Sequence, residues 1–161
     1  MKAVWTAAAL LAALLVQSAL SRIAPNLARI LDPFLLVLVY CGLVGGETHG
    51  MLTGLAAGWV QDVHFGGPVV GLSGLTKVVV GFGVGAAGSR FLLSGPGARA
   101  LVLFAAALAD MLLFERLAAA FEVAVQPLSV IGVLTRATLN ALVGGPLYEL
   151  VDRRLLKEAR G

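Results

Sequence analysis

The residue types that most often perform catalysis or bind metals are sparse in this chain, which has two histidines and one cysteine. His49 and His64 stand near opposite ends of one expected helix, so they are too far apart to share a metal ion. Asp62 is close to His64 in sequence, but on a helix the two side chains project in nearly opposite directions. Cys41 has no partner for an internal disulfide and is expected to be a small apolar filler. The sequence therefore predicts neither an enzyme nor a metal or cofactor site.

Composition places the chain in a membrane. Of its 161 residues, 59% are hydrophobic and only 13% are charged, and the mean hydropathy is +0.94. A soluble domain carries charge on about 25% of its residues. Long stretches here hold almost none, which predicts an all-α polytopic membrane protein.

Length limits the number of spans, because an α-helical span needs about 20 residues. We expect a single membrane domain, residues 1–161, whose six helices span roughly 3–20, 33–46, 49–65, 68–90, 98–121 and 127–150. The break at residues 45–49 is slight, so the second and third spans could instead form a re-entrant pair or one bent element. The first span could alternatively be a signal peptide, since Lys2 precedes an apolar run and small residues.

The positions of Lys and Arg predict the orientation, because cytoplasmic loops are enriched in both. With both termini cytoplasmic, the outer side holds Arg22 and Arg29. The inner side then holds Lys2, Arg90, Arg99, Arg153, Arg154, Lys157 and Arg160. Termini on the same side of the membrane require an even number of crossings. The bias of Lys and Arg toward the inner side also explains the excess positive charge without a nucleic-acid partner.

The segment 21–32 is not expected to be a span. Ile23, Leu27, Ile30 and Leu31 can share one side of a short helix while Arg22 and Arg29 stay in water. It is expected either to lie along the outer membrane surface as an amphipathic piece or to form an irregular loop broken at its proline.

Two ladders of glycine occur in neighbouring expected spans. Such residues let helix backbones approach closely, which favours helix association where lipid supplies no hydrophobic drive. The ladders are expected to pack against each other or the rest of the bundle, or alternatively to receive a partner's transmembrane helix. Their members are Gly50, Gly54 and Gly58 in the third span, and Gly71, Gly74, Gly81, Gly85 and Gly88 in the fourth.

Charged residues inside the spans form a candidate polar network. Counting inward at about 1.5 Å per residue, Lys77 and Arg136 lie roughly 14 Å from the outer ends of their spans. An unpaired charge there costs upward of about 2.5 kcal/mol, so acids and bases are expected to meet. We expect Asp110 to pair with Lys77 or Arg136, in a role that is either structural or in contact with a ligand, ion or partner. The candidate network comprises Asp62, Lys77, Asp110, Glu115, Arg116, Arg136 and Asn140. Asp62 could alternatively cap the turn at residues 66–68.

One run, GLAAGWVQDVHFGGPVVGLSGL, resembles the central segment of the MreD family of rod shape-determining proteins. In that family two glycines and an aspartate, each four residues apart, close one span, and a glycine loop and a glycine-led span follow. The matching residues here are Gly54, Gly58, Asp62, Gly66 and Gly71. The resemblance extends to the apolar run 33–43, and to Asn140 and Pro146 ahead of the basic tail.

The resemblance implies a non-enzymatic member of the bacterial cell-elongation machinery in the inner membrane. Such a protein binds the bitopic protein MreC through transmembrane and juxtamembrane contacts. It acts indirectly with the MreB filament, the glycosyltransferase RodA and its partner transpeptidase in lateral peptidoglycan synthesis. The resemblance also implies a fold similar to the substrate-binding subunits of energy-coupling-factor vitamin transporters.

That similarity supplies the alternative function, a vitamin-binding transporter subunit. A vitamin binder needs a pocket with aromatic and hydrogen-bonding groups around a polar ring. Trp5, Tyr40 and Tyr148 are expected to be ordinary span or interface residues, and only Trp59 lies near an outer polar group. The glycine ladders and the balanced charges favour the scaffold.

Overall fold

The computed structural model describes residues 2–66, 69–91, 95–125 and 129–158. Over these residues the chain forms six helices of at least 13 residues and one short helix. In chain order they are α1 (Lys2–Ile23), α2 (Pro25–Ala28), α3 (Pro33–Gly45), α4 (Glu47–Phe65), α5 (Leu72–Arg90), α6 (Pro96–Ala120) and α7 (Val130–Glu158).

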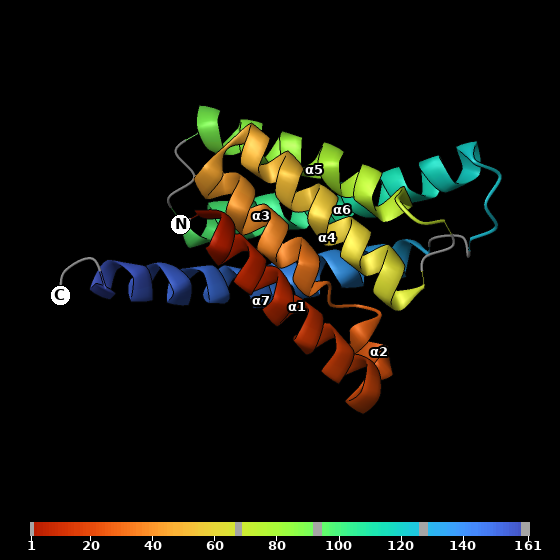
Figure 1. Cartoon of the computed structure of the whole chain (residues 1–161), viewed down its shortest axis with the longest axis horizontal. Coiled ribbons are helices and arrows are strands. Elements are labelled where there is room, and N and C mark those ends of the chain that lie inside the picture. Colours follow the sequence, from red (N-terminus) through yellow and green to blue (C-terminus); the bar gives the residue numbers. More distant parts are fainter. Residues whose placement is uncertain (1, 67–68, 92–94, 126–128, 159–161) are drawn as a thin grey trace.

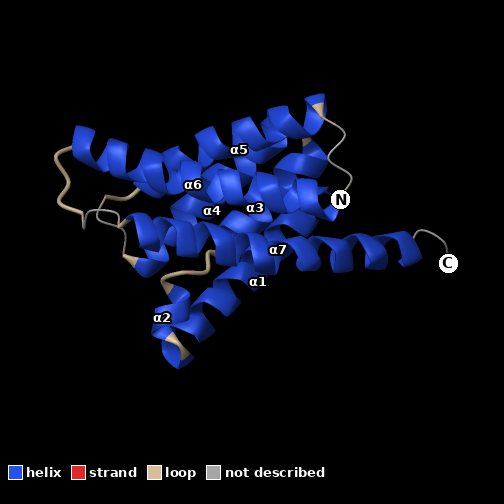
Figure 2. Ribbon diagram, turned by 180° about the vertical axis from the view of Figure 1, so that it is seen from behind, coloured by secondary structure: helices blue, strands red, loops and turns tan. Residues whose placement is uncertain are grey.

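The long helices run side by side and alternate in direction between the two ends of an elongated bundle (Figure 1). The start of α1 and the C-terminal part of α7 therefore lie at the same end, and α7 projects beyond its neighbours there (Figures 1 and 2). We call this end the terminal end. The opposite end, where α1 finishes and α7 begins, is the distal end.

Five stretches of the described residues are long and apolar enough to cross a membrane: Ala3–Ile23, Pro25–Gly45, Leu72–Arg90, Pro96–Ala120 and Val130–Arg154. The protein is thus an all-helical, multi-pass membrane protein. Helix α4 is not among the five, because polar residues occupy both of its ends. It nevertheless packs against both α3 and α5 along its length.

Helix α3 lies at the centre of the bundle and packs against α1, α4, α5, α6 and α7. Its Leu35, Leu38 and Val39 form the main core with Val80 of α5 and Leu103 of α6. This packing brings Asp32, which precedes α3, beside Lys77 of α5 and Asn140 of α7. The fold therefore directs the polar groups of several helices toward one place near the distal end.

Glycines let α4 and α5 approach until their backbones touch. A Cβ added at Gly50 would lie 2.2 Å from the carbonyl oxygen of Gly81, and one at Gly54 would lie 2.2 Å from that of Lys77. At Gly58 it would lie 2.4 Å from Gly74. No real Cβ accepts such distances, so these positions admit only glycine in this packing. The face of α4 that carries its ladder is covered by α5 of the same chain.

One glycine expected on the α5 packing stripe has another position. Gly71 precedes the helix in a left-handed conformation, with φ of 98°, and an added Cβ would have no neighbour within 4 Å. Its conformation serves the turn into α5 rather than helix packing. Gly88 keeps its expected packing role, but its close contact is with the backbone of Leu43 in α3 rather than with α4.

Segment 21–32 is neither an irregular loop nor one continuous amphipathic helix. Helix α1 continues to Ile23, and α2 follows with proline at its first turn. The Gln17 side chain donates a hydrogen bond to the carbonyl oxygen of Ala28 at 2.9 Å, which holds α2 beside the end of α1.

Candidate functional site

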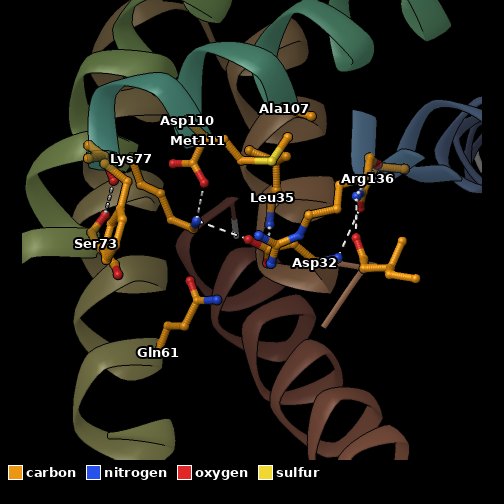
Figure 3. Close-up of a pocket in the computed structure, with 13 residues that line it drawn as sticks. Asp32, Leu35, Gln61, Ser73, Lys77, Ala107, Asp110, Met111 and Arg136 are labelled. Carbon is orange, nitrogen blue, oxygen red and sulfur yellow. Dashed lines mark hydrogen bonds and ion pairs between the residues drawn. The ribbon is translucent and has the colours of Figure 1, made fainter. Parts of the chain in front are cut away.

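An ion triad lies among α3, α5 and α6. The Lys77 ammonium donates to Asp32 Oδ2 at 3.0 Å and to Asp110 Oδ2 at 2.9 Å (Figure 3). Lys77 is only 2% exposed. The structure thus brings Asp110 and Lys77 together, and it adds a second carboxylate, Asp32, which the sequence placed just outside a span.

Asp32 is held by the start of its own helix and by α7. Its Oδ1 accepts from the backbone N–H of Leu35 at 3.1 Å and so caps α3, whose first residue is Pro33. Asn140 Oδ1 accepts from the Asp32 backbone N–H at 2.9 Å, and Asn140 Nδ2 donates to the carbonyl oxygen of Ile30 at 2.9 Å. Asn140 is 2% exposed, so α7 fixes the turn that presents Asp32 to Lys77.

A pocket of about 200 Å³ surrounds this triad. Arg136 extends into it from α7 toward Asp32, and Gln61 points into it from α4 (Figure 3). Arg136 also attracts the Asp32 carboxylate electrostatically. The lining residues are Ile30, Asp32, Leu35, Gln61, Ser73, Thr76, Lys77, Ala107, Asp110, Met111, Phe114, Arg136 and Asn140.

Asp62, expected in the polar network, instead closes the turn between α4 and α5. Its Oδ2 accepts from the backbone N–H groups of Gly71 at 2.8 Å and Ser73 at 3.0 Å. The carboxylate is 2% exposed and lies at the start of α5, where unpaired N–H groups and the helix dipole favour a negative charge. The physical reason for the difference is that backbone donors, rather than a side-chain cation, neutralise this acid.

Of the remaining members of the expected network, some line the pocket and others do not. Arg136 and Asn140 line the pocket with Lys77 and Asp110. Glu115 and Arg116 follow Asp110 on α6 and are not among the residues that line the pocket, and Arg116 is exposed. Phe114, directly before Glu115, still lines the pocket, so Glu115 and Arg116 lie outside it because they project from other sides of α6.

A second polar cluster, which was not predicted from the sequence, lies toward the terminal end. The Tyr40 hydroxyl donates to Asp152 Oδ1 at 2.9 Å, and Arg99 forms an ion pair with the other oxygen of that carboxylate. Tyr148, 2% exposed, donates to the carbonyl oxygen of Leu36 at 2.6 Å. The cluster ties α3, α6 and α7 together. Only the coincidence of a tyrosine, an arginine and an acid at one membrane depth could have indicated it.

The histidines and the cysteine serve helix contacts. His49 Nε2 lies 3.0 Å from the Thr6 hydroxyl, and His64 Nε2 lies 3.5 Å from the Ser18 hydroxyl, so both link α4 to α1. Cys41 is buried, with its sulfur 3.8 Å from the Thr6 hydroxyl oxygen. Within the described ranges no three His, Cys, Asp or Glu residues are grouped so that they could hold a metal ion.

These features define a class. The protein is a multi-pass helical membrane protein whose buried charged side chains form ion pairs and whose helices α4 and α5 pack closely through glycine residues. Residues 2–157 match the family model of the rod shape-determining protein MreD. Because the match covers nearly the whole chain, the protein belongs to the MreD family. It is a non-enzymatic membrane protein of cell-shape determination.

No curated protein and no solved structure matched the chain. The expected likeness to energy-coupling-factor subunits therefore stays a prediction.

Proposed function

We propose that this protein is a membrane scaffold of the cell-elongation complex that binds MreC in the inner membrane. Through MreC it helps to organise MreB, RodA and the partner transpeptidase during lateral peptidoglycan synthesis. The family supports association with the rod complex. The choice of MreC as direct partner, and the six-crossing topology with both termini cytoplasmic, belong to the proposal.

The observation that carries this proposal is the exposed face of α1. Only 11% of the candidate span Ala3–Ile23 is buried inside the bundle, the smallest share of the five in the described residues. Val4, Ala8, Ala12 and Val16 recur every fourth residue on this face and are all exposed. Small residues at this spacing allow a second helix to approach closely in lipid. A bitopic protein such as MreC supplies one transmembrane helix of that kind.

The glycine ladder of α4 does not supply the docking face in this proposal, because α5 already covers it. The alternative function, a vitamin-binding subunit, is less well supported by the pocket. Its volume of about 200 Å³ falls below the roughly 300–1,000 Å³ that is typical of ligand pockets. Phe114 is the one aromatic residue among its lining residues in the described part of the chain.

Affinity purification of the tagged protein from native membranes tests the function. Recovery of MreC and the wall synthases supports the scaffold, whereas recovery of an ATPase pair with a coupling subunit supports the transporter. Replacing Ala8 and Ala12 with leucine is expected to reduce MreC recovery about tenfold, the equivalent of about 1.4 kcal/mol.

The matched control is Ala105→Leu, which changes an exposed alanine on α6 and should leave recovery unchanged. Equal MreC recovery by the α1 variant and the parent would show that the partner uses another face. Absence of MreC from the parent's purified complex would contradict the proposed function itself.

A further inference from the structure

The pocket around the ion triad contains two hydrogen-bond acceptors that the protein does not satisfy. Asp110 Oδ1 and Gln61 Oε1 are buried, and neither has a hydrogen-bond partner within the described residues. A buried polar atom left unpaired costs about 1–3 kcal/mol. Both residues line the same pocket, so the pocket is suited to a group that brings N–H or O–H donors.

Arg136 calls for a ligand group of the opposite kind, one that accepts hydrogen bonds. Its guanidinium carries only donors, and the side chain extends into the pocket from α7 (Figure 3). Lys77, in contrast, is already paired with two carboxylates. Arg136 is thus the cation in the lining best placed to receive an anionic oxygen from a ligand.

Charge balance then restricts the ligand further. The pocket lining carries two cations, Lys77 and Arg136, and two anions, Asp32 and Asp110. A ligand of net charge would leave that charge uncompensated in a largely apolar bundle. A zwitterion that presents an ammonium to one side and an anion to the other meets both requirements. The pocket volume of about 200 Å³ suits a lipid headgroup rather than a larger metabolite.

We propose that this pocket binds a phosphoethanolamine group. The primary ammonium donates to Asp110 Oδ1 and Gln61 Oε1, and the phosphate accepts from the Arg136 guanidinium. Such a group reaches the pocket either as the headgroup of phosphatidylethanolamine or as free glycerophosphoethanolamine, since the phosphate in both is a diester with one negative charge. A choline headgroup cannot replace it, because its quaternary nitrogen has no N–H to donate.

Native mass spectrometry tests the site after the protein is equilibrated with equal amounts of phosphatidylethanolamine, phosphatidylcholine and phosphatidylglycerol. The parent is expected to retain phosphatidylethanolamine about tenfold over phosphatidylcholine, the effect of about 1.4 kcal/mol from charge-assisted hydrogen bonds. Equal retention of the three lipids would overturn the proposal, and this comparison needs no variant.

Variants then place the lipid in the pocket. Gln61→Leu and Arg136→Met should each abolish the preference for phosphatidylethanolamine, while the control Arg116→Met, which removes an exposed cation outside the pocket, should keep it. Unfolding temperatures measured in the same detergent select variants that are folded. A preference that survives in both folded pocket variants would also overturn the proposal.

Competition with free glycerophosphoethanolamine separates the two sources. Displacement of the lipid by the free compound supports the site with a soluble ligand. Persistence of the lipid, together with sensitivity to both pocket variants, supports the site with a membrane ligand.

Discussion

At the scale of single residues, one buried ammonium organises the distal half of the bundle. Lys77 reaches carboxylates from two other helices, and Asn140 holds the turn that carries one of them. A buried ion pair adds little net stability over apolar packing, but removal of one partner strands the other charge. The role of the triad is therefore to fix the positions of α3, α5 and α6 relative to one another.

Substitution of Lys77 tests this role. Lys77→Met keeps the apolar stem but leaves Asp32 and Asp110 without their shared cation, so we expect a loss of about 3–5 kcal/mol in unfolding free energy. Asp110→Asn should cost less, because Lys77 keeps Asp32 and the amide oxygen still accepts a hydrogen bond. The measurement is reversible unfolding in mixed micelles. Equal stability of Lys77→Met and the parent would contradict the structural role of the triad.

At the scale of elements, the α4–α5 interface is a backbone contact. Its glycines permit this contact because they have no side chain. Gly54 touches the carbonyl of Lys77 itself. Packing of these helices and placement of the ammonium are therefore coupled. A side chain inserted between the helices would move the triad as well as the interface.

A pair of single-methyl substitutions isolates this effect. Gly54→Ala places a Cβ 2.2 Å from a backbone oxygen of α5, and we expect it to destabilise the protein by about 1–3 kcal/mol. Gly83→Ala, on the same pair of helices, meets no atom within 4 Å and should cause no loss. Thermal unfolding of both variants in one detergent provides the comparison. Equal unfolding temperatures of the two variants would show that the protein's stability does not depend on the close approach of α4 and α5.

Sequence reasoning succeeded where periodicity or charge balance decides the outcome. The six longer helices overlap the expected ranges, and Asp110 forms an ion pair with Lys77, as the cost of an unpaired charge within a span predicts. It failed where one residue serves two purposes. Asp32 caps α3 and also binds Lys77, and only the first role is visible in the Asp32-Pro33 pair.

Asp62 shows a second limit. Capping of the turn after its helix was one of its two expected roles, but the N–H groups that it accepts from belong to Gly71 and Ser73 at the start of α5, and no residue type reveals which N–H groups a carboxylate will meet. The cluster of Tyr40, Asp152 and Arg99 shows a third, since it joins residues far apart in the chain whose meeting depends on how three helices are rotated. Helix rotation is set by packing, and a single sequence does not specify it.

At the scale of the whole molecule, basic residues divide between the two ends. Arg90, Arg99 and Arg153 lie toward the terminal end, and Arg22 and Arg29 lie toward the distal end. The enrichment of Lys and Arg on the cytoplasmic side of membrane proteins then predicts that the terminal end is cytoplasmic. The ion triad and its pocket, near the distal end, would face the outer half of the membrane.

Cysteine labelling in spheroplasts tests this orientation and the crossing by α3 and α4 together. Cys41 is 8% exposed and should react slowly, so single cysteines introduced at exposed positions report clearly. With a membrane-impermeant maleimide, Asn26→Cys in α2 should react in intact spheroplasts, whereas Arg90→Cys should react only after lysis. Thr48→Cys, in the first turn of α4, should behave like Arg90→Cys if α3 and α4 each cross the membrane. Thr48→Cys that stays unreactive after lysis would indicate a re-entrant α3–α4 pair, and reaction of Arg90→Cys before lysis would reverse the orientation.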